Sequence, residues 1–281
     1  MTGRPISAAT RLFAVLGDPV AHSLSPALHG AALAARRLDA VYLALRCGDR
    51  DAVGLVRGLA LAGGGGNVTV PHKRRAAEAV DRRTPAVERT GACNTFWSDD
   101  GAVWGDNTDV AGFRGAVTAL LPEGVAGARV LLLGAGGAAR AALAGLLDDG
   151  VREVAILNRS VDRARELIRG MGAEGSATAL DGEGALSGED FDLVVQATSL
   201  GLHPSDPLPT SLDRCRGVGA ALDLVYGREP TRWVRAARER GVPAADGREM
   251  LLLQAAAAFR RWFGDPVPMA EMRAALNERD G

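Results

Sequence analysis

The stretch ARVLLLGAGGAARAALAGLLDDGVREVAILNRSVDRARELI, residues 128–168, decides the fold. Its first part, 129–133, is a nearly continuous apolar run, which is typical of a strand buried on both faces of a parallel sheet. A glycine-rich turn follows, and residues 138–147 have the composition of a helix. A second apolar run occupies 154–157. Strand, helix and strand in this order predict a βαβ unit and therefore a parallel α/β sheet.

The turn within this unit has the spacing of a dinucleotide-binding loop. Gly134 and Gly136 occupy the first two glycine positions, and Ala139 occupies the third, where the pattern also accepts alanine. Glycine lets the backbone approach a pyrophosphate, which the free N–H groups and the dipole of the following helix stabilise. Such turns also occur for packing alone, but the flanking strand and helix favour a nucleotide. The residues expected to contact the cofactor here are Gly134, Ala135, Gly136, Gly137 and Ala138.

The end of the second strand indicates which dinucleotide is bound. NAD-binding units usually place Asp or Glu there, about 20 residues after the glycines. This chain instead has Asn158, Arg159 and Ser160, followed by Arg163. Guanidinium groups pair with a 2′-phosphate and stack on adenine, so we expect NADP as the cofactor, held by these four residues. The alternative is that the two arginines are solvated side chains in an arginine-rich protein.

Lys73 is the only lysine in a chain that carries 33 Lys and Arg residues. Arginine keeps its proton in proteins, whereas burial and neighbouring charges can lower the pKa of lysine into a working range. A position that must transfer a proton can therefore use lysine and cannot use arginine. We interpret Lys73, in the motif NVTVPHK (67–73), as a candidate proton donor.

Composition places the chain among ordinary globular proteins. Its 281 residues are 47% hydrophobic, which allows a sizeable core and, at this length, favours two domains. A formal net charge of -1 argues against a general nucleic-acid or membrane-surface binder. Without a long apolar run or a signal-peptide core, a cytoplasmic location is expected. Cys47, Cys93 and Cys215 lack metal-ligand spacing, so we expect reduced thiols and no metal site.

The rest of the sequence continues the α/β pattern. Further strand-like runs are LFAVLG (12–17), VYLALRC (41–47), NVTV (67–70), FDLVVQAT (191–198) and AALDLVY (220–226). The glycines at 63–66 are expected to form a turn before the third of these. A helix is expected to begin at Ser25, and a closing helix to run from about Arg248 to Phe263 with Gln254 in its apolar stripe.

Two motifs at expected helix starts leave two interpretations open. In SLSP (23–26), Ser25 can cap the helix, but Ser23 and Ser25 together can also seat a carboxylate near the helix dipole. In GDNTD (105–109), the polar residues can cap a helix, with Asp106 the stronger candidate, or they can contact a ligand.

The chain resembles the shikimate dehydrogenases in nine motifs that occur in the same order along nearly its whole length. The matching motifs are SLSP (23–26), NVTVPHK (67–73), GACNT (91–95), GDNTD (105–109), GAGGAAR (134–140), NRSVDR (158–163), ATSLG (197–201), DLVY (223–226) and DGREMLLLQA (246–255).

This resemblance implies an open α/β substrate domain and a Rossmann NADP-binding domain inserted into it. The substrate domain would comprise residues 1–110 and 247–281, and the Rossmann domain residues 111–246. The implied activity is the reversible, NADPH-dependent reduction of 3-dehydroshikimate to shikimate. Among relatives of this kind a homodimer is common, and monomers also occur.

By motif position, the resemblance also implies roles for individual residues. Lys73 and Asp109 would be the catalytic pair, with Lys73 protonating the developing alkoxide. The implied substrate-binding residues are Ser23, Ser25, Thr69, Asn94, Gln254 and Tyr226. The implied cofactor contacts near the nicotinamide are Thr198, Leu224 and Gly247.

Three departures from the family pattern leave alternatives open. Gln196 replaces an Asn, Cys93 replaces a Val, and Arg248-Glu249 replace a small or apolar pair. Because the charged pair precedes Gln254, preference for quinate or an aminoshikimate stays open, although we expect this pair to point to solvent. A third possibility is a non-catalytic paralogue that binds a metabolite, against which the intact Lys73 and Asp109 argue.

Overall fold

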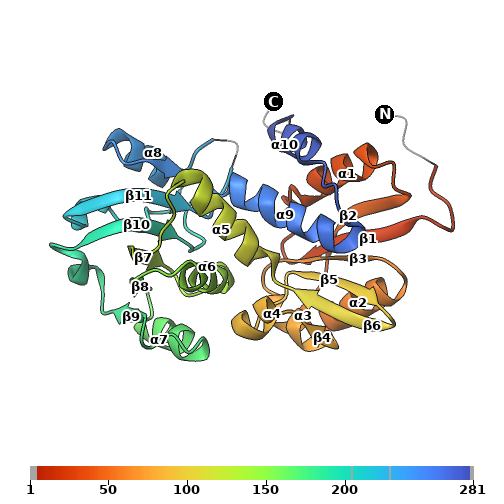
Figure 1. Cartoon of the computed structure of the whole chain (residues 1–281), viewed down its shortest axis with the longest axis horizontal. Helices are drawn as coiled ribbons and strands as arrows, with labels where there is room; N and C mark the ends of the chain where they lie inside the picture. Colours follow the sequence, from red (N-terminus) through yellow and green to blue (C-terminus); the bar gives the residue numbers. More distant parts are fainter. Residues whose placement is uncertain (1–4, 204, 228, 279–281) are drawn as a thin grey trace. The chain divides into compact units, whose positions relative to one another are not determined.

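The computed structural model describes residues 5–203, 205–227 and 229–278 (Figure 1). The chain divides into two units. The first unit comprises the described residues up to Thr108 and from Gln254 onwards, and the second runs from Asp109 to Leu253. Each unit is described by itself below.

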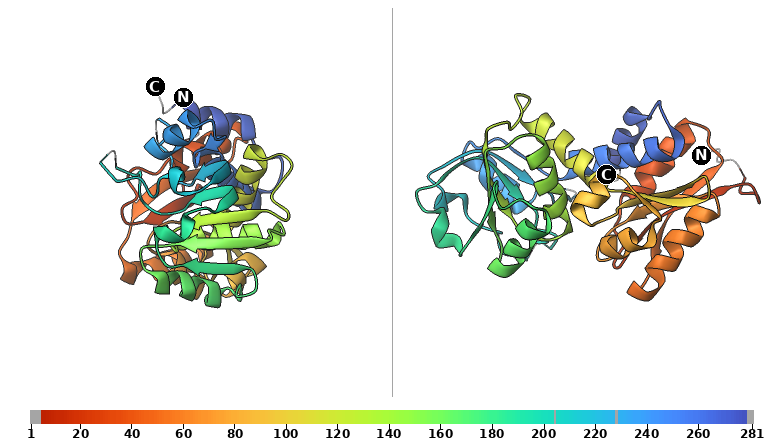
Figure 2. Two further views of the ribbon diagram at one scale, coloured as in Figure 1. Left: turned by 90° about the vertical axis from the view of Figure 1, so that its left-hand side faces the viewer. Right: turned by 60° about the horizontal axis from the view of Figure 1, so that its bottom comes forward.

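The second unit contains a six-stranded sheet in the order β12-β11-β10-β7-β8-β9 (Figures 1 and 2). Its strands are β7 (Arg129–Leu133), β8 (Glu153–Leu157), β9 (Ala177–Leu180), β10 (Asp190–Gln196), β11 (Gly217–Asp223) and β12 (Ala244–Ala245). All neighbouring strands are parallel. Counted from the first strand, this is the order 3-2-1-4-5-6 of a doubly wound dinucleotide-binding fold. The expected α/β fold class is therefore confirmed.

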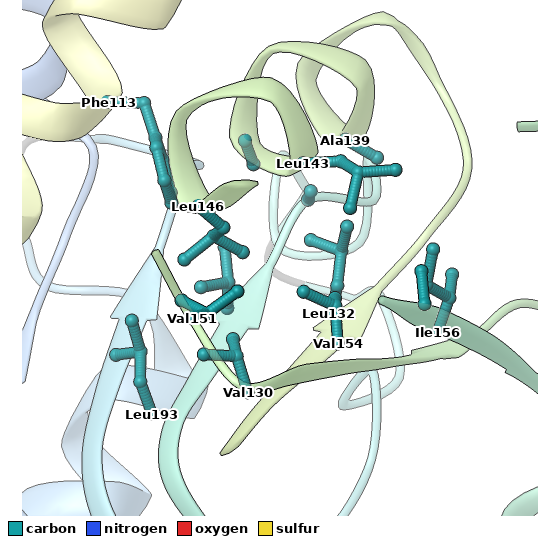
Figure 3. Packing of buried hydrophobic residues seen from close by; sticks show 14 of the residues in the cluster. Phe113, Val130, Leu132, Ala139, Leu143, Leu146, Val151, Val154, Ile156 and Leu193 are labelled. Atoms are coloured by element: carbon teal, nitrogen blue, oxygen red, sulfur yellow. The ribbon is translucent and has the colours of Figure 1, made fainter. Parts of the chain in front are cut away.

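Helices cover both faces of this sheet. The helices assigned wholly or mainly to this unit are α5 (Thr108–Leu120), α6 (Gly137–Asp148), α7 (Val161–Gly170) and α8 (Arg232–Glu239), with short 3-10 helices at Glu183–Leu186 and Leu212–Arg214. On β7, Val130 and Leu132 belong to the core under α6, as Figure 3 shows, whereas Leu131 and Leu133 belong to the core under α8. Burial on both faces explains why the strand is a continuous apolar run.

The first unit contains a mixed six-stranded sheet in the order β2-β1-β3-β5-β6-β4. Its strands are β1 (Arg11–Gly17), β2 (Ala40–Arg46), β3 (Gly65–Val68), β4 (Arg82–Arg83), β5 (Thr95–Asp99) and β6 (Ala102–Asp106). β5 is antiparallel to both β3 and β6, and the other pairs are parallel. Asp100 and Gly101 both have positive φ and form the tight turn between β5 and β6.

Alternate residues of β1 separate the two cores of this unit. The helices here are α1 (Ser25–Ala35), α2 (Asp49–Leu61), α3 (Lys73–Ala79), α4 (Pro85–Thr90) and α10 (Met269–Glu278), with α9 (Arg248–Phe263) contributing its part from Gln254 onwards. Ala14 and Leu16 face a cluster that includes Val56 of α2. Phe13 faces the opposite side, where its ring lies 5.0 Å from that of Trp262 on α9.

The glycine run at 63–66 differs from the expected turn. Gly65 and Gly66 are the first two residues of β3, and the strand ends at Val68 rather than at residue 70. A Cβ atom on Gly65 would lie 2.6 Å from the carbonyl oxygen of Phe96 on β5. The glycines therefore allow β3 to pack closely between its neighbours, a long-range requirement that resembles a turn signal in the sequence.

Two glycine-to-alanine substitutions test this packing because their expected effects have opposite signs. In α2, a Cβ on Gly58 would meet no atom within 4 Å, so Gly58→Ala should stabilise the protein by ~0.5–1 kcal/mol through helix propensity. In α6, a Cβ on Gly145 would lie 2.8 Å from the ring of Phe113. Gly145→Ala should therefore destabilise, because overpacking costs ~1–3 kcal/mol and outweighs propensity. Urea unfolding of both variants measures the two changes, and shifts of the same sign would contradict the packing.

Candidate active site

The strands of the second unit end side by side, which brings the expected cofactor residues together. Leu133 is in register with Leu157 on one side and Gln196 on the other, and Gln196 is in register with Asp223. The residues that follow these strand ends include Gly134, Asn158, Thr198 and Leu224. Loops at the carboxyl ends of parallel strands are where α/β folds bind ligands.

The glycine-rich loop fits a dinucleotide in its detailed geometry. Gly134 has a φ of 109°, which favours glycine, and a Cβ there would lie 3.0 Å from the carbonyl oxygen of Ala197. Gly136 is the N-cap of α6 and, like Gly134, brings no side chain to the loop. The first N–H groups of α6 therefore meet no capping side chain from that position, as a pyrophosphate-binding loop requires.

The end of β8 carries the expected adenosine-side residues. The side-chain amide of Asn158 donates to the carbonyl oxygen of Ser160 at 2.8 Å and closes the turn into α7. Arg159 and Arg163 are both exposed, one just before this helix and one in its first turn. Exposed guanidinium groups at this strand end are suited to an anionic substituent on the ribose.

Gln196 fixes the turn that contains Thr198. The side chain of Gln196 is fully buried at the end of β10. Its side-chain oxygen Oε1 accepts from the backbone N–H of Thr198, and its side-chain nitrogen Nε2 donates to the carbonyl oxygen of Leu200 at 2.7 Å. The departure at 196 therefore has a structural role in shaping the loop.

Asp223 fixes the next loop. This residue was not identified from the sequence, although an acidic residue within the apolar run AALDLVY could have indicated it. Its carboxylate accepts from the N–H of Val225 at 2.9 Å and from the hydroxyl of Thr231 at 2.6 Å. Burial raises the pKa of Asp223 to about 6. Burial also raises the pKa of Tyr226, and the negative charge of Asp109 adds to that shift. The last effect shows that the expected residues Tyr226 and Asp109 interact electrostatically.

The Arg248 side chain corrects the expectation that the Arg248-Glu249 pair points to solvent. Its side chain is only 25% exposed, and Nε donates to the carbonyl oxygen of Gly227 at 3.1 Å. Arg248 thus holds the segment after Tyr226. The preceding residue, Gly247, is buried, and a Cβ there would lie 2.8 Å from the carbonyl carbon of Leu224. Glycine at 247 therefore lets two expected cofactor-binding segments pack directly against each other.

Lys73 is the first residue of α3, and long-range contacts fix its position. The ring of His72 lies 2.9 Å from the Asp49 carboxylate and 2.8 Å from the carbonyl oxygen of Cys47, so His72 is structural. The carbonyl oxygen of Lys73 accepts from the N–H of Cys93 at 2.9 Å. This contact places the lysine beside the segment that contains Asn94. The Lys73 side chain is half-buried.

Asn94 caps helix α5, which corrects the capping role expected for Asp106. The Asn94 Oδ1 atom accepts from the backbone N–H of Thr108 at 2.8 Å. Asp106 accepts from the backbone N–H of Asn107, one residue before the helix, at 2.7 Å, and its other partners are the Thr84 hydroxyl at 2.6 Å and Arg261 at 2.8 Å. A cap from a residue just before β5, 14 positions earlier in the chain, cannot be recognised from local sequence.

The amide nitrogen of Asn94 faces a second expected substrate residue. This Nδ2 atom lies 3.5 Å from Oε1 of Gln254 on α9. Both residues are buried, with Gln254 8% exposed. Thr69 directly follows β3, and its N–H donates to the carbonyl oxygen of Leu16 at 2.8 Å. The first unit therefore gathers Lys73, Asn94 and Gln254 from three separate segments.

The structure also does not show the capping role considered for Ser25. The N-cap of α1 is Leu24, which has helical dihedral angles, so the chain enters the helix one residue earlier than a Ser25 cap requires. The backbone N–H of Ser25 donates to the hydroxyl of Ser23 at 3.3 Å. Ser25 is buried, and its side chain lowers the pKa of Tyr42 against the larger rise that burial causes. Two hydroxyl groups at one helix start remain a suitable seat for a carboxylate.

The donor set limits the chemistry of the two units. Hydroxyls, amides and one ammonium group in the first unit suit a small carboxylate that bears hydroxyl groups. Within the described ranges, no three His, Cys, Asp or Glu side chains are arranged to hold a metal ion. None of the helices in the described part of the chain is long and apolar enough to cross a membrane.

Three protein-family models match the chain in consecutive segments. The shikimate dehydrogenase substrate binding domain matches residues 15–96, and the shikimate / quinate 5-dehydrogenase family matches residues 118–202. The shikimate 5'-dehydrogenase C-terminal domain matches residues 247–276. These segments contain most of the motifs on which the resemblance rests.

Whole-length relatives agree with these matches. A shikimate dehydrogenase (NADP(+)) of Bacillus cereus (strain G9842) is 36% identical over 274 residues, covering 96% of this chain and 99% of the relative. One of Maricaulis maris (strain MCS10) is 41% identical and covers 95% of each chain. The crystal structure of shikimate 5-dehydrogenase from Thermus thermophilus in complex with NADP(H) and shikimate has a TM-score of 0.83 at 35% identity, covering 96% of this chain and all of that one. This chain belongs to the shikimate dehydrogenase family.

Proposed function

We propose that this protein catalyses the reversible, NADPH-dependent reduction of 3-dehydroshikimate to shikimate, a step toward chorismate and the aromatic amino acids. The observation that carries the proposal is the gathering of Lys73, Asn94 and Gln254 in the first unit, with a dinucleotide-binding loop in the second. The names of the relatives support the same assignment.

Lys73 is the proton donor in the proposed reaction. When bound, NADPH supplies the hydride for the carbonyl carbon of the substrate. The Lys73 ammonium protonates the alkoxide that develops on the carbonyl oxygen, and in the reverse direction the neutral amine accepts this proton. Asp109, the other member of the catalytic pair that the family resemblance implies, is the proposed partner of Lys73.

The polar side chains of the first unit bind the substrate in this proposal. Ser23 and Ser25 hold its carboxylate through hydroxyl donors at the start of α1. The groups of this unit that hold its ring hydroxyls are Thr69, Asn94 and Gln254, and Tyr226 of the second unit is a further proposed substrate-binding residue. Side chains that can both donate and accept suit a hydroxyl, which does both.

The second unit holds the cofactor. Residues 134–138 accommodate the pyrophosphate, and Asn158, Arg159, Ser160 and Arg163 the adenosine side with its 2′-phosphate. Thr198, Leu224 and Gly247 border the nicotinamide end. We further propose a cytoplasmic location and a homodimer.

The first prediction is that Lys73→Arg lowers turnover by about 10²-fold or more, which is the lower range for general acid catalysis. Arginine keeps the positive charge but cannot release a proton. The measurement is NADPH absorbance at 340 nm with shikimate or 3-dehydroshikimate as the substrate. Quinate in the same assay tests the alternative substrate. Absence of turnover by the native protein with every substrate tested would favour a non-catalytic paralogue.

A matched control is Arg75→Lys, the reverse exchange on the same helix. Arg75 is exposed and forms a surface ion pair with Glu78, 3.3 Å away. This variant should keep normal turnover. Turnover of Lys73→Arg within a few fold of the native value would contradict the assigned proton transfer.

The second prediction concerns the choice of NADP. Replacing Arg159 or Arg163 by alanine should raise the KM for NADPH by about 10–100-fold, because a charge-assisted hydrogen bond contributes about 1.5–3 kcal/mol. The KM for NADH should change little, since NADH has no 2′-phosphate. Arg165→Ala is the control, because Arg165 lies on α7 together with Arg163 and pairs with Asp162 at 3.0 Å. Equal losses with both cofactors would argue against phosphate recognition.

A further inference from the structure

Tyr42 is buried although it lies on β2, an edge strand of the first unit's sheet. Its side chain is 6% exposed, while its neighbour Leu43 is 48% exposed. The Tyr42 hydroxyl passes over β1 and donates to Oδ1 of Asn67 on β3 at 2.6 Å. Burial raises the pKa of Tyr42 well above its ordinary value, so the phenol keeps its proton for this bond. No motif in the sequence draws attention to this residue.

Asn67 passes the contact on to the next strand. Its Nδ2 atom donates to the hydroxyl oxygen of Thr95 at 2.9 Å and to the carbonyl oxygen of Asn94 at 3.1 Å. Asn67 and Thr95 are direct cross-strand partners of β3 and β5. The Thr95 hydroxyl then donates to Oδ1 of Asn94 at 2.9 Å. We call the connected residues Tyr42, Asn67, Thr95 and Asn94 the Tyr42 relay.

Backbone groups fix the direction of every bond in the Tyr42 relay. The N–H of Thr108 can only donate, so the Asn94 atom that faces it is the oxygen, and the Asn94 nitrogen turns toward Gln254. The carbonyl oxygen of Asn94 can only accept, so the Asn67 atom that faces it is the nitrogen. The remaining Asn67 atom is an acceptor, and Tyr42 is its donor.

Aromatic packing holds the phenol in this orientation. The ring of His29 stacks on Tyr42 with centroids 4.4 Å apart and an interplanar angle of 22°. Burial lowers the pKa of His29 to about 3, so the ring is neutral near pH 7. Trp262 lies against both rings, with centroids 5.0 Å from His29 and 6.0 Å from Tyr42.

We propose that Tyr42 is a positioning residue for the substrate, acting through Asn67 and Thr95 on the Asn94 amide. The inference rests on the proposed function, in which Asn94 binds a hydroxyl group of the substrate. Tyr42 itself touches no reacting atom. Its hydroxyl sets the orientation of the Asn94 amide through two intervening side chains.

Tyr42→Phe is the test, because it removes one hydroxyl and keeps the aromatic stack. Loss of the donor leaves Oδ1 of Asn67 unpaired in a buried place, which loosens the amides behind it. The KM for shikimate should rise about 5- to 20-fold, within the range expected for one unsatisfied buried group. The KM for NADP and kcat should stay within about 3-fold of the native values.

Three controls separate positioning from general loss of stability. Val56→Ala removes buried apolar contact on the other face of this sheet and should lower the melting temperature without changing the KM for shikimate. Thr95→Val interrupts the Tyr42 relay at another link and should reproduce the KM rise. Thr95→Ser keeps the hydroxyl and should restore the native KM. This pair also serves as the test if Tyr42→Phe does not fold.

The outcomes distinguish this inference from the proposed function. If the native protein oxidises shikimate but Tyr42→Phe and Thr95→Val leave the KM for shikimate unchanged, the positioning role alone is overturned. Equal changes in the KM values for shikimate and NADP would also overturn it, because they would indicate general disorder. Native protein with no NADP-dependent turnover of shikimate would overturn both.

Discussion

Backbone groups at the ends of strands and helices must be hydrogen-bonded, and in both units a buried side chain supplies the missing partner. Asn94 does so for the start of α5, Gln196 for the turn after β10 and Asp223 for the turn after β11. These three side chains are at most 3% exposed. Leaving such a group unpaired costs about 1–3 kcal/mol, so the loops that carry the functional residues are held by the core.

The second unit was predictable because its strands are buried on both faces. Such strands are continuous apolar runs, and the expected bounds 129–133 and 154–157 agree with β7 and β8 to within one residue. The glycine-rich turn and the start of α6 followed from the same local pattern. The domain boundaries at 110 and 246 stay predictions, because they depend on contacts between distant segments that no local pattern contains.

The first unit was less predictable because its special residues respond to neighbours far along the chain. Gly65 looks like part of a turn but is required by the closeness of β5, and Asp106 looks like a helix cap although Asn94 has that role. Arg248 looks like a solvated charge, yet it holds the carbonyl oxygen of Gly227. In each case the residue type was informative, whereas its partner could be found only in three dimensions.

The candidate site shows the same division between residue type and partner. Motif positions identified Asn94, whose side chain is expected to face a ligand, but not Tyr42, whose partner Asn67 lies two strands away across β1. The burial of Tyr42 beside the exposed Leu43 shows only that the Tyr42 side chain faces inward. What it does there follows from the fixed polarity of two backbone groups, the Thr108 N–H and the Asn94 carbonyl. These backbone groups dictate which end of each amide faces inward. The hydrogen bonds that the fold requires of Asn67 and Asn94 are therefore the same ones that orient the candidate site.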